Sequence, residues 1–453
     1  MKKFLLLLSA VTLMLAACSK DEKTKILSSI PSETGYVLLF DLQNLNDDLG
    51  NKTEGDGKIT LSNEFKTFLN NTFYQDGVQL AELLQSGKLA IDYSYGAVFE
   101  NKNRPVATFY VTDTDKFIDG FGSYGSVDFS KEGDIWFSKD HYIAVAKSQV
   151  WMITYGQPFT PDEILLLSKL DEKKSVLSKD YFKTISEKND DIQFFTDIDS
   201  FFGTEERYMG VRFSLATILE NVKYIAGSAN FEKGKAVANA EFLDKNSKPC
   251  KMALQLDEVD INKLNSLNSK GSVFFALNIN SATIAPFFSQ YESVLKSQLG
   301  NDSGLITGLK NIDGTIAFSM NADPANGTAF DIVIPFKTPD SASAVESFAS
   351  QMFQGSGVTT EGSSLRISEG TSFGADFSSV SEKFKGSLGG VVISFKDFEN
   401  AFSNEVAKYI SNVILTFHKS GNGLQMRLTS DSKPGQNYLI SLMQMSEAMK
   451  NKK

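Results

Sequence analysis

A short pattern that occurs four times limits the fold of this chain more than any other feature. In each copy an apolar run of strand-forming residues ends at Asp or Asn, and a mixed polar and apolar segment follows. The junctions lie at Asp41, Asp197, Asn278 to Asn280, and Asp397. Asp and Asn at such a junction can accept hydrogen bonds from the free amides of a helix's first turn. The pattern therefore predicts four strand-to-helix units, and we interpret these side chains as helix caps rather than as the lining of a site.

A hairpin signal follows each copy of the pattern. The predicted hairpins span residues 95–111, 225–242, 316–336 and 413–428. In the last two, apolar and polar residues alternate on both sides of a Gly- and Asn-rich turn, which predicts an antiparallel strand pair with one buried face. Helical stretches follow the first and third hairpins, at 116–121 and 342–353.

These signals predict an α+β fold with two tandem, internally repeated halves, each built from strand-helix-hairpin modules and largely antiparallel sheets packed by helices. The N-terminal half covers 31–262 and the C-terminal half covers 268–453. The copies at 192–202 and 392–402 align without a gap, so we interpret the repeat as a tandem duplication. The segment 438–449 is predicted to be an amphipathic helix whose Met-rich face belongs to the core rather than to a docking site.

The N-terminus has the pattern of a secretion signal. Lys2 and Lys3 precede an apolar run that ends at Leu15-Ala16-Ala17-Cys18. This run is shorter than the roughly 20 apolar residues of a transmembrane helix. It resembles a bacterial lipoprotein signal, in which the cysteine is acylated and becomes the first mature residue. The resemblance implies a signal peptide over 1–17, lipidation of Cys18, a lipidated polar tether over 18–30 and attachment to the outer membrane through the lipid.

The tether does not decide whether the protein faces the cell surface or the periplasm. A Lys-Asp-Glu run at Lys20-Asp21-Glu22 resembles the surface-export signal of Bacteroidota lipoproteins. A solvated spacer would serve a periplasm-facing protein equally well. Both the surface-exposed and the periplasmic arrangement therefore remain predictions.

Charge and cysteine content exclude several classes of function. The net charge is −10, and it becomes more negative when the signal peptide is removed, which argues against a nucleic-acid partner. Besides Cys18 only Cys250 is present, so no intrachain disulfide can form, and we expect Cys250 to be buried. The two histidines, His141 and His418, belong to no spaced ligand motif, so we expect no metal site and no cofactor.

Two strings look catalytic but stand in the wrong context. Gly120 to Gly125 fits G-x-G-x-x-G, yet a helix is predicted before it and a strand after it, the inverse of the nucleotide-binding arrangement. Gly370 to Gly374 fits the nucleophile elbow around Ser372, with Asp397 and His418 downstream. The spacing from Ser372 to His418 is too short for the βα units of a hydrolase, Asp397 is already assigned as a cap, and His418 is predicted to face solvent.

The mature start, Ile30-Pro31 followed by Tyr36 to Leu42, resembles the opening of a family of Bacteroidota envelope lipoproteins of unknown function. That resemblance implies no activity, cofactor or catalytic residue. We therefore expect a non-enzymatic, envelope-anchored binding or scaffold module with a protein or glycan partner in the envelope. Two alternatives stay open: a serine hydrolase that uses Ser372, and a carrier of an apolar ligand with a Phe-lined cavity between sheet and helices.

Overall fold

The chain forms two compact units. The computed structural model describes residues 20–54, 57–73, 75–125, 127–153, 155–180, 182, 189–202, 218–267, 270–290, 292, 296, 303–323, 327–370, 375–395, 404–421, 423–432 and 435–450. Unit 1 comprises Met1–Gly210, Val222–Lys248 and Pro434–Lys453, and unit 2 comprises Val211–Asn221 and Pro249–Lys433. The units differ from the predicted halves in two ways, because the main division falls at Lys248 rather than near 262, and because the C-terminal segment belongs to unit 1.

Unit 1 contains one large antiparallel sheet rich in aromatic and β-branched residues, which favour extended backbone. Its strands pair in the order β6-β7-β8-β9-β5-β4-β1-β10-β11-β12. Their bounds are β1 (Tyr36–Asp41), β4 (Ile91–Asn101), β5 (Arg104–Val111), β6 (Phe129–Glu132), β7 (Ile135–Ser138), β8 (Ile143–Ala146), β9 (Gln149–Ile153), β10 (Ile192–Asp197), β11 (Tyr224–Glu232) and β12 (Lys235–Leu243). A separate small hairpin joins β2 (Lys52–Thr53) to β3 (Ile59–Thr60).

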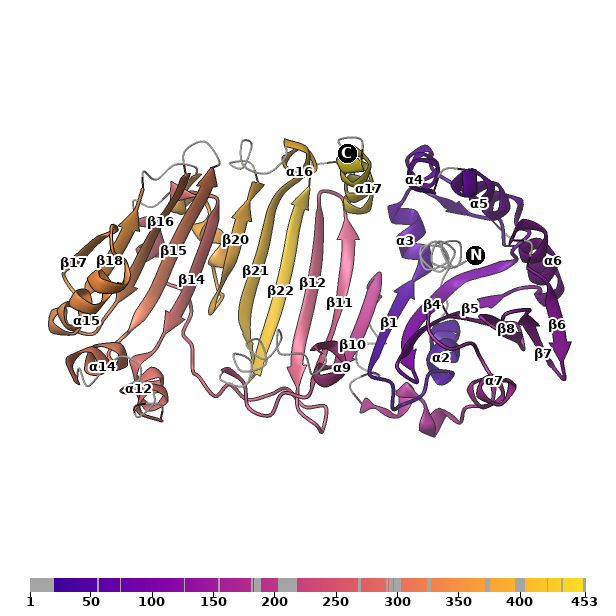
Figure 1. Cartoon of the computed structure of the whole chain (residues 1–453), viewed down its shortest axis with the longest axis horizontal. Helices are drawn as coiled ribbons and strands as arrows, with labels where there is room; N and C mark the ends of the chain where they lie inside the picture. Colours follow the sequence, from indigo (N-terminus) through magenta and orange to yellow (C-terminus); the bar gives the residue numbers. More distant parts are fainter. Residues whose placement is uncertain are drawn as a thin grey trace. The chain divides into compact units, whose positions relative to one another are not determined.

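Helices pack on both faces of this sheet, so its middle strands are buried on both sides. One face packs against α3 (Leu42–Asp48), α4 (Asn63–Phe73), α5 (Gln75–Ser86), α6 (Thr114–Gly125) and α17 (Tyr438–Lys450). The other face packs against α2 (Lys20–Ser28), α7 (Pro161–Ser168) and the 3-10 turn η2 (Val176–Ser178), which follows the exposed 3-10 turn η1 (Glu172–Lys174). Helices α3 to α6 follow one another along one side of the unit (Figure 1).

The segment predicted as a polar tether over 18–30 is folded from Lys20 onward. It forms α2, and Ile26, Leu27 and Ile30 are fully buried in the core of unit 1. The sequence begins this segment with polar residues, which favoured the tether prediction. The buried apolar residues lie at the end of α2 and just after it.

The cap prediction is confirmed at the copies that the structure describes. The Asp41 carboxylate accepts the Asn44 amide at 3.1 Å at the start of α3, and Asp197 accepts the Asp199 amide at 2.8 Å at the start of α9 (Ile198–Phe202). In the third copy Asn280 accepts the Ala282 amide at 2.9 Å. Asp397 lies outside the described residues.

The strands of unit 2 pair antiparallel in the order β17-β18-β16-β15-β14-β20-β21-β22. The bounds are β14 (Val273–Ile279), β15 (Gly314–Asp323), β16 (Gly327–Pro335), β17 (Gly357–Glu361), β18 (Ser364–Glu369), β20 (Gly389–Ser394), β21 (Ile410–Ser420) and β22 (Gly423–Ser432). Two short strands, β13 (Lys270–Gly271) and β19 (Ala375–Asp376), pair beside it.

The helices of unit 2 gather in two places. One group, α11 (Ile261–Asn265), η4 (Phe377–Ser379) and η5 (Ser381–Phe384), covers one sheet face and forms a core with Phe274, Ala317 and Val392. A second group lies together beside β17 and β18 (Figure 1): α12 (Ser281–Gln290), α14 (Ser303–Lys310) and α15 (Pro339–Met352). Helix α16 (Asn404–Tyr409) leads directly into β21.

The two sheets share a central topology. In unit 1 the hairpin β4–β5 flanks β1, which pairs with β10, and β10 pairs with the hairpin β11–β12. In unit 2 the hairpin β15–β16 flanks β14, which pairs with β20, and β20 pairs with the hairpin β21–β22. The α+β class, the four hairpins and the helices after the first and third of them are confirmed. A duplication as the origin of the two halves stays a prediction.

Candidate functional site

The sheet of unit 2 has an apolar face on which none of the described helices of this unit forms a core. The large side chains that alternate along its strands are half-buried, and Leu428 is 39% exposed. We call this set the open face: Val273, Phe275 and Leu277 on β14; Ile316, Phe318 and Met320 on β15; Phe330, Ile332 and Ile334 on β16; Val391 and Ile393 on β20; Val413, Leu415 and Phe417 on β21; Met426 and Leu428 on β22.

The strand register makes the open face continuous. Phe318 stands opposite Phe275 on one side and Ile332 on the other. Farther along, Val391 stands opposite both Phe275 and Leu415. At about 4.8 Å between neighbouring strands, the six strands from β16 to β22 give a face about 24 Å across.

The opposite face of the same strands carries small and polar side chains together with Phe274, Val392 and Ile414, and it is the covered one. Ala276, Ala317, Ser319 and Thr416 are at most 4% exposed. The prediction that the third and fourth hairpins are antiparallel with one buried face is confirmed, but that face is the one of Ala317, Ser319 and Thr416 and not the one of the large alternating apolar residues. The covering segments α11, η4 and η5 pack on Phe274, Ala276, Ala317 and Val392, whereas no described helix of unit 2 forms such a core with the large apolar residues on the other side.

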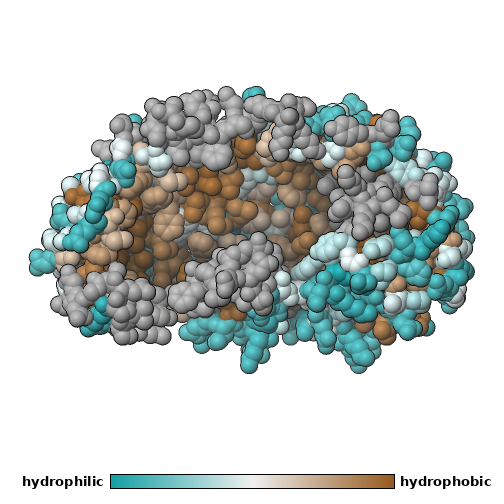
Figure 2. Space-filling view, in the orientation of Figure 1, coloured by the Kyte–Doolittle hydropathy of each residue, from teal (hydrophilic) through white to brown (hydrophobic). Residues whose placement is uncertain are grey.

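Figure 2 shows the result as a hollowed, hydrophobic surface over strands β14, β15 and β20 to β22. Soluble proteins seldom expose apolar patches larger than a few hundred Å², and a larger one usually marks a binding surface. The open face is therefore the main candidate site of unit 2.

Unit 1 contains a separate apolar cavity of about 420 Å³. It lies between one face of the sheet and three helices, and its walls are almost entirely apolar. The lining residues are Phe40, Ile192 and Phe231 from the sheet, Leu45 and Leu49 from α3 and its end, Phe68 from α4, and Leu439, Leu442, Met443 and Ser446 from α17. The helix predicted over 438–449 thus contributes both to the core, where Met443 is buried, and to a cavity wall.

A pair of interacting carboxyl groups lies elsewhere in unit 1. Asp48 immediately precedes Leu49, and Asp191 immediately precedes Ile192, but neither carboxyl group lines the cavity. Burial, followed by the charge of Asp191, raises the pKa of Asp48 to about 8, and burial raises the pKa of Asp191 to about 6. The pair therefore holds a proton near neutral pH. The sequence analysis missed it, since residues so far apart in the chain carry no shared spacing signal.

The structure does not show whether the three residues of the hydrolase hypothesis lie together. Ser372 and Asp397 lie outside the described residues, as do the signal peptide and Cys18. His418 is half-buried rather than solvent-facing: its Nδ1 lies 3.1 Å from the Gly386 carbonyl and its Nε2 lies 2.9 Å from the Thr416 hydroxyl. Both ring nitrogens thus have hydrogen-bond partners in unit 2.

The string from Gly120 to Gly125 forms the last turns of α6 and is therefore not a phosphate-binding loop. A side chain at Gly120 would come within 2.4 Å of the Lys88 carbonyl oxygen, so glycine permits close packing there. Within the part of the chain that the structure describes, no group of three or more His, Cys, Asp and Glu could hold a metal ion. The described helices also include none that is both long and apolar enough to span a bilayer.

Comparison with known proteins finds only weak structural similarity. No protein-family model matches the chain, and no curated protein matches it. Among solved structures, crystal form I of TP0453 aligns with a TM-score of 0.30 and 9% identity, covering 49% of this chain and 80% of that one. Crystal form III of TP0453 aligns with a TM-score of 0.24 and 7% identity, covering 79% of this chain and 96% of that one. Similarity at this level says nothing about function.

Proposed function

We propose that this chain is a non-enzymatic, lipid-anchored protein of the cell envelope that binds the acyl chains of membrane lipids on the open face of unit 2. The observation that carries the proposal is the exposure of a continuous row of large apolar side chains, with Phe275, Phe318 and Leu415 near its middle. Burying each lipid methylene there would contribute about 0.8 kcal/mol.

The chemistry of the open face favours an acyl chain over the other partners that we expected. Its side chains are hydrocarbon or thioether and offer no strong hydrogen-bond donor or acceptor. A glycan requires such groups, whereas an acyl chain requires only apolar contact. The hollowed surface in Figure 2 also matches an inserted chain better than a flat protein partner.

The predicted lipid anchor is consistent with this role. Cys18 stands two residues before Lys20, where the folded helix α2 begins. Two extended residues reach about 7 Å. Two or three acyl chains on Cys18 would therefore hold unit 1 close to a bilayer. We propose the outer membrane as that bilayer, and a surface-exposed or a periplasmic protein would satisfy the proposal equally.

The proposal is tested by lipid extraction from vesicles. Vesicles of phosphatidylethanolamine that contain a phospholipid with a self-quenching fluorescent acyl chain are mixed with the protein, and transfer of the probe relieves quenching. We expect the wild-type protein to increase fluorescence. The Phe318→Asp variant places a charge at the centre of the open face and should lower the affinity at least about tenfold.

The matched control is Met352→Asp, because Met352 is 65% exposed and is the last residue of α15, outside the strands that form the open face. This variant should extract lipid as the wild-type protein does. Folding of unit 2 is followed through the thiol of Cys250, which is 1% exposed and should resist labelling in every variant. Absence of extraction by the wild-type protein, or full extraction by the Phe318→Asp variant, would overturn the proposal.

A further inference from the structure

The apolar cavity of unit 1 departs from the packing of an ordinary core. Protein interiors are close-packed and leave few voids larger than a water molecule. This cavity has a volume of about 420 Å³, which falls within the range of pockets that hold small ligands. A space of this size leaves the apolar side chains around it without packing partners on one side.

The large side chains that line the cavity are only partly buried. Phe40, Phe231 and Leu439 pack against the buried core of unit 1 and keep part of their surface exposed. Deeper in the same core, Phe65 and Leu69 on α4 are fully buried. A hydrocarbon chain in the cavity would bury more of the surface of the lining residues, and burial of apolar surface favours binding.

The lining also restricts the polar end of a ligand. None of the described residues that line the cavity is charged, and among them Ser446 on α17 is the only one with a polar side chain. A charged group that moves into apolar surroundings without a partner loses its hydration and is not compensated. A hydroxyl group can instead form a hydrogen bond with the hydroxyl of Ser446. The lining therefore favours an uncharged ligand over an acid or an amine.

We infer that this cavity is a second ligand site, which binds a single hydrocarbon chain that ends in an uncharged polar group, as in a long-chain alcohol. The chain contacts Phe40 and Phe231 of the sheet and Leu442 of α17. All of the lining residues belong to unit 1, so the site does not depend on the open face of unit 2.

The test compares decanol, decanoic acid and decylamine, three probes that share one chain length and differ in the polar end. Each probe is titrated by calorimetry at neutral pH, below the concentration at which it precipitates or forms micelles. The titrations use the full chain with Phe318→Asp, so that hydrocarbon on the open face of unit 2 does not contribute. We expect decanol to bind at least about tenfold more tightly than either charged probe.

The position of the site is tested with Leu442→Trp, whose larger side chain fills the cavity and should abolish decanol binding. The matched control is Met449→Trp, which places the same side chain on α17 at a position that is 41% exposed and does not line the cavity. This control should bind decanol as the parent protein does. Ser446→Ala removes the hydroxyl and should weaken decanol binding at least about twofold. Far-ultraviolet circular dichroism shows whether each variant is folded.

Failure of decanol to bind, or equal binding of decanol and the two charged probes, would overturn the inference. Unchanged decanol binding in the Leu442→Trp variant would place the ligand elsewhere and have the same consequence. Unchanged binding in the Ser446→Ala variant would overturn the assignment of the polar end. Because lipid extraction from vesicles tests the open face separately, decanol binding without extraction contradicts only the proposed function, and extraction without decanol binding contradicts only this inference.

Discussion

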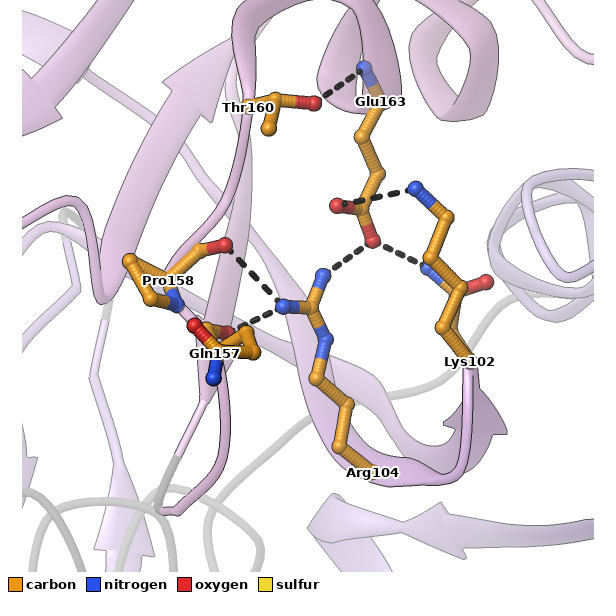
Figure 3. A network of polar contacts seen from close by, with 7 residues as sticks. Lys102, Arg104, Gln157, Pro158, Thr160 and Glu163 are labelled. Atoms are coloured by element: carbon orange, nitrogen blue, oxygen red, sulfur yellow. Dashed lines mark hydrogen bonds and ion pairs between the residues drawn. The ribbon is translucent and has the colours of Figure 1, made fainter.

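Arg104 and Glu163 form an ion pair in which the two side chains are only 5% and 4% exposed. The Arg104 guanidinium also donates to the carbonyl groups of Gln157 and Pro158, and Lys102 lies 3.5 Å from the second oxygen of Glu163 (Figure 3). The pair therefore fixes the turn between β4 and β5 to the first turn of α7.

Removing one member of this pair should destabilise unit 1 strongly, because the other charge would be left buried. We expect Glu163→Ala to lower the free energy of unfolding by about 3–5 kcal/mol. Urea unfolding followed by tryptophan fluorescence measures this quantity for unit 1 alone, since both tryptophans lie there. The control is Glu232→Ala, which breaks an exposed pair with Lys235 and should cost less than about 1 kcal/mol. Equal effects of the two substitutions would show that the buried pair contributes no more to the free energy of unfolding than the exposed pair does.

Neighbouring residues on β14 should respond very differently to truncation. Phe274 is fully buried and packs on Phe377 with ring centroids 5.0 Å apart, whereas Phe275 lies on the open face. We expect Phe274→Ala to cost about 3–5 kcal/mol and Phe275→Ala about 1 kcal/mol. Labelling of the Cys250 thiol as urea is raised reports on unit 2, where this residue is buried. Similar costs for the two variants would mean that the open face is covered in solution.

The hairpins and caps were predictable because they depend on local chemistry. Gly234, at a φ of 79°, fixes the turn at 233–235, and the Asp41 side chain reaches an amide only three residues away. Alternation along β15 likewise predicts that Ile316, Phe318 and Met320 share a face. It does not say which face the rest of the unit covers, and in unit 2 the covered face is that of Ala317 and Ser319.

The candidate sites were less predictable because they depend on contacts between distant segments. The cavity needs α17, from the end of the chain, to pack beside α3 and α4 near its start. The carboxyl pair needs β10 to lie beside β1, which brings Asp191 to the end of α3. A Phe-lined cavity between sheet and helices was foreseen as a type of site, but its place could not be read from periodicity.

The close approach of α6 to the backbone of Lys88 should explain why position 120 is a glycine. A methyl group at this position would meet the backbone of Lys88, which cannot move aside as a flexible side chain can. We therefore expect Gly120→Ala to cost about 1–3 kcal/mol in unit 1, despite the higher helix propensity of alanine. Gly122→Ala, in the same helix and with a nearest contact at 3.2 Å, should be close to neutral when both are measured by tryptophan fluorescence in urea. A neutral Gly120→Ala variant would leave the glycine string without this explanation.

The stability of unit 1 should fall as the pH rises from about 5 to about 8. Burial raises the pKa of Asp48 from 3.8 to about 8, so the folded state keeps a proton that the unfolded state has already released. The stabilisation from this proton is fully present below the ordinary pKa and is lost as the pH rises through the folded value. Asp191, whose pKa is raised to about 6, acts in the same direction.

The Asp48→Asn variant separates the titration of this pair from the titration of the other acidic residues, because an amide can donate a hydrogen bond to Asp191 without titrating. We expect its unfolding free energy, measured by tryptophan fluorescence in urea without added ligand, to depend less on pH than that of the wild-type protein. At about pH 8 the variant should be the more stable of the two, since the wild-type pair then carries two adjacent negative charges. Glu232→Gln removes an exposed carboxylate of the same unit and should keep the wild-type slope. If the Asp48→Asn and wild-type proteins lose stability in parallel, the proton is not held by this pair and the pair is not the pH-sensitive element of unit 1.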